Sequence, residues 1–226
     1  NTTYAQDMLL DRTWSNRISA WGFVAVLLIL PMLSNEGLFG LDIIPSLWVS
    51  VVAKIAIFAI AVQGLNIIMG YTGQISLGHA AFMAVGAYTA AILVRELGFT
   101  FWTALPVTML FTGFVGLLFG LPSLRVKGFY LAMATLAAQN IIIWVITYPL
   151  ANLTGGANAI TLESHPVPFF GSNATKLGMY YIIIPFAVLS FLIARNLIRT
   201  RTGRAFISIR DNDLAAELLG INVFTY

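Results

Sequence analysis

Three long stretches of this chain contain no charged residue. Asp, Glu, Lys and Arg are all absent from Ile55 to Val94, from Leu97 to Leu124 and from Gly128 to Leu162. Each stretch is longer than the roughly 20 apolar residues with which an α-helix crosses a bilayer. Polar and apolar residues do not alternate along them, as they would in the strands of a membrane β-barrel. We therefore predict an all-α fold, a polytopic transmembrane helix bundle.

The composition also favours lipid as the solvent. Charged residues make up 9% of the 226 residues, whereas ordinary soluble domains carry about 25%. The chain has no Cys, and its two histidines, His79 and His165, lie far apart. We therefore predict no disulfide, metal site or cofactor. The basic residues flank the apolar stretches and form no stripe, so no nucleic-acid partner is predicted.

Turn residues divide the apolar stretches into six predicted spans. The spans are Ile18–Leu33, Pro45–Met69, Ile75–Val94, Phe101–Leu121, Phe129–Leu150 and Met179–Asn196. Residues 1–196 then form a transmembrane region, and residues 197–226 form a cytoplasmic segment. Small residues recur four apart, and we expect them to let helices pack closely in lipid. These pairs are Gly116 and Gly120, Ala80 and Ala84, and Gly86 and Ala90.

The distribution of Lys and Arg between the loops predicts the orientation. With the N-terminus inside, the cytoplasmic side receives Arg12, Arg17, Arg125, Lys127, Arg195, Arg199, Arg201, Arg204 and Arg210. The external side receives only Arg95 and Lys176, and Lys54 lies within the second span. Cytoplasmic loops carry the excess of positive charge, so the N-terminus and the segment after Asn196 are predicted to be cytoplasmic. A long loop, Ala151–Gly178, is then external.

The cytoplasmic segment contains a short predicted helix, Asp213–Gly220. Asn212 or Asp213 can cap its start by accepting a backbone N–H. Gly220 can end it in the left-handed conformation.

From Gly64 onward the chain carries an ordered series of short motifs. They are Gly64-Leu65-Asn66, the run from Gly70 to Phe82, Gly86-Ala87-Tyr88, the run from Arg125 to Ala132, Thr135-Leu136-Ala137, Thr154-Gly155-Gly156, Gly203-Arg204-Ala205, Ile209-Arg210, Ala215-Ala216-Glu217 and Gly220-Ile221-Asn222. Each motif alone is weak, but the ordered set closely resembles LivM-type permeases, the membrane subunits of branched-chain amino acid ABC importers. The resemblance covers roughly residues 55–226. It departs at Ala159, where the family often has a third Gly.

The resemblance implies an importer of hydrophobic amino acids in the bacterial inner membrane. Its expected partners are two cytoplasmic ATP-binding subunits, a second homologous permease, a periplasmic substrate-binding protein and membrane lipid. Family members continue with further spans, so more chain is expected beyond Tyr226.

The same resemblance identifies Asp213–Gly220 with the helix that couples such permeases to their ATPase subunits. Small side chains would allow close approach, Glu217 would pair with a basic partner, and leucines would supply an apolar face. The residues assigned to this role are Asp213, Ala215, Ala216, Glu217 and Gly220. The alternative is a helix on the lipid surface, but such helices usually carry Lys or Arg on the polar face.

A solute pathway is predicted near the break after Gly70. A helix starting near Ile75 would present free N–H groups to a carboxylate, with Gln74, Ser76 and His79 facing the path. The alternative is an ordinary turn at the membrane interface. Two further polar pairs, Gln63 with Asn66 and Thr135 with Gln139, each share a helix face. They would either line the path or hydrogen-bond neighbouring helices.

Other function classes find less support in the sequence. An ion-coupled secondary transporter would normally place an ionisable residue within the membrane, and only Lys54 is available. No Walker A motif or catalytic grouping occurs, so a membrane enzyme is disfavoured and no catalytic residue is predicted. The alternative is a permease for urea or short-chain amides, because the motifs do not distinguish it from an amino acid permease.

Overall fold

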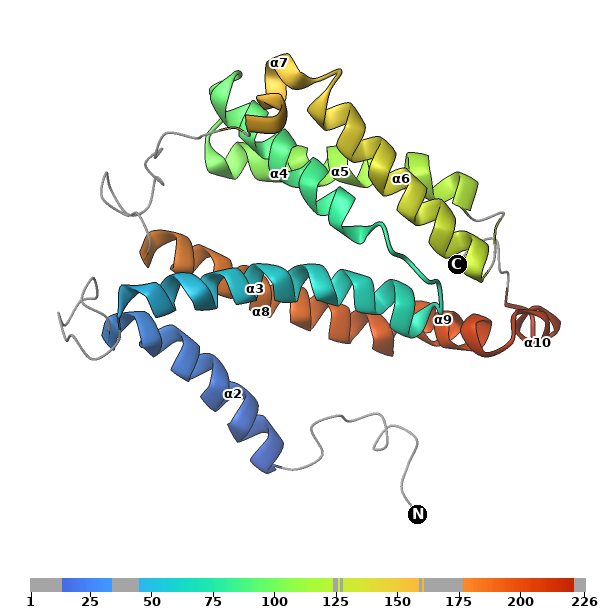
Figure 1. Cartoon of the computed structure of the whole chain (residues 1–226). Coiled ribbons are helices and arrows are strands. Elements are labelled where there is room, and N and C mark those ends of the chain that lie inside the picture. Colours follow the sequence, from blue (N-terminus) through green and yellow to red (C-terminus); the bar gives the residue numbers. More distant parts are fainter. Residues whose placement is uncertain are drawn as a thin grey trace. The chain divides into compact units, whose positions relative to one another are not determined.

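The computed structural model describes residues 14–33, 45–123, 126, 128–158, 160 and 177–221, and every regular element among them is helical (Figure 1). The elements are α2 (Trp14–Ile29), η1 (Leu30–Leu33), α3 (Ser46–Asn66), η2 (Ile67–Tyr71), α4 (His79–Arg95), α5 (Phe101–Ser123), α6 (Phe129–Thr147), α7 (Ala151–Thr154), η3 (Gly156–Asn158), α8 (Leu177–Arg199), α9 (Arg201–Asp211) and α10 (Asp213–Leu218). The predicted all-α class is confirmed.

Four helices are long and apolar enough to cross a membrane. They are Leu47–Tyr71, Phe101–Leu121, Phe129–Thr147 and Gly178–Arg199, which correspond to the predicted second, fourth, fifth and sixth spans. The predicted first and third spans correspond to the shorter apolar helices Trp21–Leu33 and His79–Arg95. The chain is thus a membrane protein with several spans, and the count of six stays a prediction.

The chain divides into two compact units: the described residues within 1–64 and 166–226 form the first, and those within 65–165 form the second. In the first unit, α3 runs alongside α8 (Figure 1), and their contact buries Val49, Ala56, Tyr180 and Ile184. The phenol of Tyr180 is fully buried and donates a hydrogen bond of 2.6 Å to the carbonyl of Leu27 on α2. A buried tyrosine needs such a partner for its hydroxyl, so this bond fixes α2 against α8.

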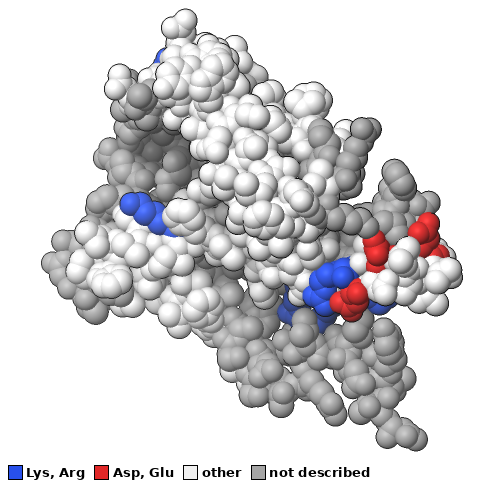
Figure 2. Space-filling model, turned by 45° about the vertical axis from the view of Figure 1, so that its right-hand side comes forward, with Lys and Arg blue, Asp and Glu red and all other residues white. Residues whose placement is uncertain are grey.

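The charged end of the first unit follows α8 directly. Thr200 caps α9 by accepting a hydrogen bond from the Gly203 N–H. A Cβ atom at Gly203 would lie 2.3 Å from the carbonyl oxygen of Ile198, so the turn into α9 requires glycine. The acidic side chains visible in Figure 2 lie among basic ones over α9 and α10, where Arg210 and Asp211 form an ion pair of 2.9 Å.

In the second unit, α4 packs against both α5 and α6. Its core consists of Ala81, Val85, Ile142 and Ile146. The small residues of α4 fit this role because short side chains let helices approach. Gly116 and Gly120 of α5 show no such packing within the described part of the chain, because a Cβ atom at either would meet none of its atoms within 4 Å. These glycines border a cavity instead.

The Thr-Gly-Gly motif ends the second unit after α6. Thr154 is 1% exposed, and its hydroxyl donates to the carbonyls of Ile146 at 2.7 Å and Leu150 at 3.0 Å. The same oxygen accepts from the Gly156 N–H. Gly155 and Gly156 both have positive φ angles, 74° and 58°, which only glycine adopts freely. Ala159, the departure from the family pattern, lies outside the described residues.

Candidate functional site: a cavity beside the start of α4

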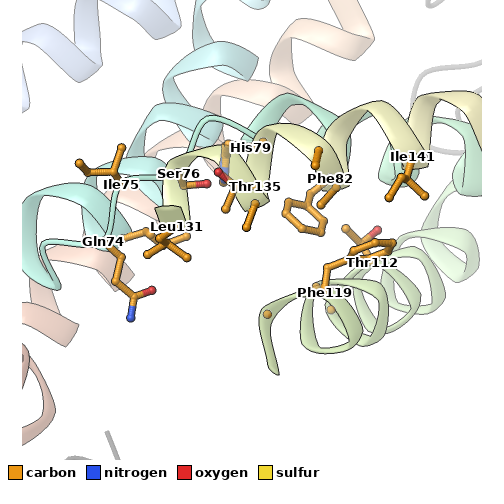
Figure 3. A pocket seen from close by; sticks show the side chains of 18 of the residues that line it. Gln74, Ile75, Ser76, His79, Phe82, Thr112, Phe119, Leu131, Thr135 and Ile141 are labelled. Atoms are coloured by element: carbon orange, nitrogen blue, oxygen red, sulfur yellow. The ribbon is translucent and has the colours of Figure 1, made fainter. Parts of the chain in front are cut away.

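The second unit contains a cavity of about 930 Å³ bordered by α4, α5 and α6. Most of its wall is apolar, with Phe82, Phe119, Leu131 and Ile141 among the lining side chains (Figure 3). No Asp, Glu, Lys or Arg is among the residues that the structure places on this wall. The polar lining side chains are Gln74, Ser76, His79, Thr108, Thr112 and Thr135. Ligand sites commonly combine an apolar wall with a few placed polar groups.

The chain stops being helical just before the cavity. The helix α3 continues as the π-helical turn η2, in which the Thr72 N–H donates to the carbonyl of Ile67. The Gln74 N–H then donates to the Ile68 carbonyl at 3.1 Å, and Gly73 adopts a positive φ of 71°. π-helical turns are frequent at functional sites. This one places Gln74 and Ser76 on the cavity wall.

The next helix, α4, begins at His79 and not near Ile75 as predicted. Two contacts with α6 hold the preceding residues out of the helix. The Leu77 N–H donates to the Thr135 hydroxyl at 3.0 Å, and that hydroxyl donates to the Ala132 carbonyl at 2.9 Å. Gly78 is buried so tightly on α6 that a Cβ atom would lie 2.4 Å from the Thr135 carbonyl oxygen. These contacts replace the helical turn that local sequence favoured.

Of the predicted pathway residues, four line the cavity and three do not. Gln74, Ser76, His79 and Thr135 are on its wall; Figure 3 shows Ser76, His79 and Thr135 close together. The Thr135 hydroxyl is occupied in holding Leu77. Gln63, Asn66 and Gln139 are not among the lining residues. The Asn66 side chain instead lies over Gly70. A Cβ atom added at Gly70 would be 2.5 Å from the side-chain oxygen of Asn66.

Sequence reasoning missed two polar residues of the wall, Thr108 and Thr112 on α5. Their four-residue spacing places both on one helix face, and this was the available signal. It was weak because a threonine within an apolar helix usually bonds its own backbone.

The short helix α10 is capped as predicted. Asn212 accepts a hydrogen bond of 3.1 Å from the Ala215 N–H, and Gly220 has a φ of 85°. One part of the prediction needs correction, because Ala216 is only 2% exposed and packs within the chain. Ala215 and Glu217 are exposed, and the leucines Leu214 and Leu218 are 70% and 89% exposed.

No group of three His, Asp or Glu side chains that could hold a metal occurs within the described ranges. The polar atoms at the cavity are those of neutral groups and one imidazole, which can bind a solute by hydrogen bonds. The described chain therefore combines apolar helices long enough to cross a membrane with a cavity whose described wall carries no charged side chain.

Comparison with known proteins gives the family. Residues 47–226 match the permease component of branched-chain amino acid transport systems, and the chain belongs to this family. It is similar to the high-affinity branched-chain amino acid transport system permease protein LivM of Escherichia coli K12, with 32% identity over 74% of this chain and 44% of the relative. The LivM protein of Salmonella typhimurium LT2 is 31% identical over 77% of this chain and 46% of the relative. The chain thus spans less than half the length of these relatives. No solved structure matches it.

Proposed function

We propose that this chain belongs to the permease subunit of an ABC importer that carries branched-chain or other hydrophobic amino acids across the bacterial inner membrane. The observation that carries this proposal is the cavity of the second unit, which is largely apolar, bears neutral polar groups and has no charged side chain on its described wall. Such a surface suits a solute with an aliphatic side chain and no net charge. The names of the relatives, both branched-chain amino acid permeases, support the same solute class.

The start of α4 is the proposed contact for the solute carboxylate. Free N–H groups and the partial positive charge of a helix N-terminus favour an anionic group. Gly78 caps α4 without any side chain. Ser76 and His79, which are near it in the sequence, line the cavity. The aliphatic part of the solute would then contact Phe82 and Leu131. These contacts should be weak, because tight binding within the path slows release.

Coupling to ATP hydrolysis is proposed to occur through α10. Its exposed surface combines Glu217 with Leu214 and Leu218, which suits a partner groove with apolar walls and a basic residue. Two ATP-binding subunits on the cytoplasmic side would provide that groove and hydrolyse the ATP. A second permease and a periplasmic binding protein complete the proposed assembly, and the binding protein provides most of the solute affinity.

A permease for urea or short-chain amides is the second candidate. The same neutral donors and acceptors on the wall would hydrogen-bond an amide as well as a carboxylate. The apolar side chains around them favour an amino acid, because urea has no apolar part to contact them. Competition between leucine and urea for uptake separates the two candidates.

The residues Gln74 and Gln139 offer a matched test of the proposal. Gln74 lines the cavity and Gln139 does not, so Gln74→Leu should lower the maximum rate of leucine uptake while Gln139→Leu leaves it near the wild-type value. The measurement is uptake by the assembled importer at saturating binding protein. Equal rates for wild type and Gln74→Leu would remove Gln74 from the path. A wild-type importer that carries no amino acid would refute the function itself.

A further inference from the structure

The hydroxyl groups of Thr108 and Thr112 differ from those of several other threonines in the described helices. Thr103, Thr147 and Thr154 each donate a hydrogen bond to a carbonyl of their own helix or turn. This is the usual arrangement in apolar helices. The Oγ1 atoms of Thr108 and Thr112 are both buried, and neither has a hydrogen-bond partner among the described residues.

Both threonines face the cavity from the middle of α5. Thr112 is the twelfth of the 23 residues of α5, and the two threonines are separated by one helical turn, about 6 Å. Opposite them on α4 is Gly86. A Cβ atom at this glycine would lie 3.5 Å from the Thr112 Oγ1 atom and 3.9 Å from the Thr108 methyl carbon. The absence of a side chain at Gly86 therefore leaves space beside the Thr112 hydroxyl and the Thr108 methyl group, and all three residues line the cavity.

This polar group is remote from the one at the start of α4. Gly86 follows His79 by seven residues of continuous helix, a rise of about 10 Å. The ammonium and carboxylate groups of an amino acid are attached to the same carbon atom, so one solute cannot contact both groups at once. The cavity thus offers two separate polar contacts joined by apolar wall.

We propose that Thr108, Thr112 and Gly86 form a second solute contact in the permeation path, distinct from the contact at the start of α4. This inference rests on the proposed function and adds a step to it. The zwitterionic head of an amino acid, which carries no net charge, exchanges hydrogen bonds with the two hydroxyls before or after it contacts the residues around His79. Paths that conduct rapidly commonly offer several weak contacts in place of one strong one. The two hydroxyls can accept from the ammonium group and donate to the carboxylate.

The test uses the full-length permease in the assembled importer, with radiolabelled leucine as the probe. Thr112→Val and Thr108→Val keep the shape of the side chain and remove the hydroxyl. Each should lower the maximum uptake rate by about three- to tenfold, as expected for one lost hydrogen bond. Thr112→Ser should restore uptake because it returns the hydroxyl. The control is Thr147→Val. The Thr147 hydroxyl bonds the Ile143 carbonyl, and Thr147 is not among the residues that line the cavity.

A second variant tests the space beside the Thr112 hydroxyl. Gly86→Ala places its Cβ atom at an ordinary contact distance, so the helix pair should remain intact. The methyl group would nevertheless fill the space beside the Thr112 hydroxyl, and uptake should fall as it does in Thr112→Val. Wild-type uptake by both Thr112→Val and Gly86→Ala would overturn the proposal.

A readout independent of turnover uses single cysteines, because the chain has none. N-ethylmaleimide should modify Thr112→Cys more slowly when leucine is present. Leu110→Cys, on the same helix but 77% exposed and absent from the cavity wall, should show no protection. Equal modification of Thr112→Cys with and without leucine, in an importer that carries leucine, would contradict the second contact while leaving the proposed function intact. Failure of the wild-type importer to carry leucine would instead refute the proposed function.

Discussion

At Gly78 the backbone leading into α4 lies directly on the backbone of α6. The Leu77 N–H reaches the Thr135 hydroxyl, and no side chain separates Gly78 from the Thr135 carbonyl. These contacts determine where α4 begins, and so which residues of the irregular segment can face the cavity. Thr135 therefore supports the wall chiefly by holding this backbone.

Gly78→Ala should destabilise the second unit. Its Cβ atom would be 2.4 Å from a backbone oxygen, and backbone cannot move aside as a flexible side chain can. We expect a loss of about 1–3 kcal/mol, as in other overpacked sites, and reduced uptake. The measurement is the thermal midpoint of the purified protein in detergent. Gly22→Ala is the control, because nothing lies within 4 Å of its Cβ position; equal midpoints for both variants would contradict the packing argument.

Thr154 is the second residue on which local structure depends. Thr154→Val keeps the shape but removes the hydroxyl that bonds the Ile146 and Leu150 carbonyls and the Gly156 N–H. We expect about 1–3 kcal/mol of destabilisation, because buried polar partners are left unpaired. Thr147→Val should be nearly neutral by comparison, since its hydroxyl makes a single bond to its own helix. An unchanged thermal midpoint for Thr154→Val would show that the turn does not need this hydroxyl.

At the scale of elements, α10 is a short helix whose inner and outer faces differ. Ala216 is buried within the chain, whereas Glu217, Leu214 and Leu218 are exposed. A helix of six residues is too short to be stable alone, so the Asn212 cap and the packing on α9 must hold it in place. A held surface of this kind is what the proposed coupling requires.

Glu217→Arg should abolish transport while the permease still inserts into the membrane. Reversal of the charge would repel the proposed basic residue of the ATPase subunit. Glu217 is exposed, so folding should be unaffected. Co-purification of the ATP-binding subunits and leucine uptake are the two measurements. Undiminished co-purification together with normal uptake would exclude this residue from coupling and favour a helix that lies on lipid.

At the scale of the whole molecule, the chain is folded as two units that each contain apolar helices. The first unit takes its helices from both ends of the chain, and the second unit is formed by residues 65–165. The cavity is built within the second unit alone. The proposed coupling helix belongs to the first.

The predicted orientation can be tested on the full-length permease with an impermeant thiol reagent. Arg201→Cys should be labelled only from the cytoplasmic side, because Lys and Arg concentrate there. Ser164→Cys should be labelled from outside. Labelling of position 201 from outside, or absence of labelling at position 164 from that side, would contradict the predicted topology.

The sequence alone determined the features that depend on neighbouring residues. Uncharged runs of sufficient length predicted apolar helices, and the Asn212 cap and Gly220 predicted the ends of α10, because hydropathy and capping act within a few residues. Tertiary structure decided the rest. The bond from Leu77 to Thr135 joins residues 58 positions apart, and it moved the start of α4 to His79. Likewise, only the packing of α4 on α5 and α6 shows that Thr108 and Thr112 face the cavity while Gln139 does not. Periodicity gives a helix its faces but not the neighbour that each face meets.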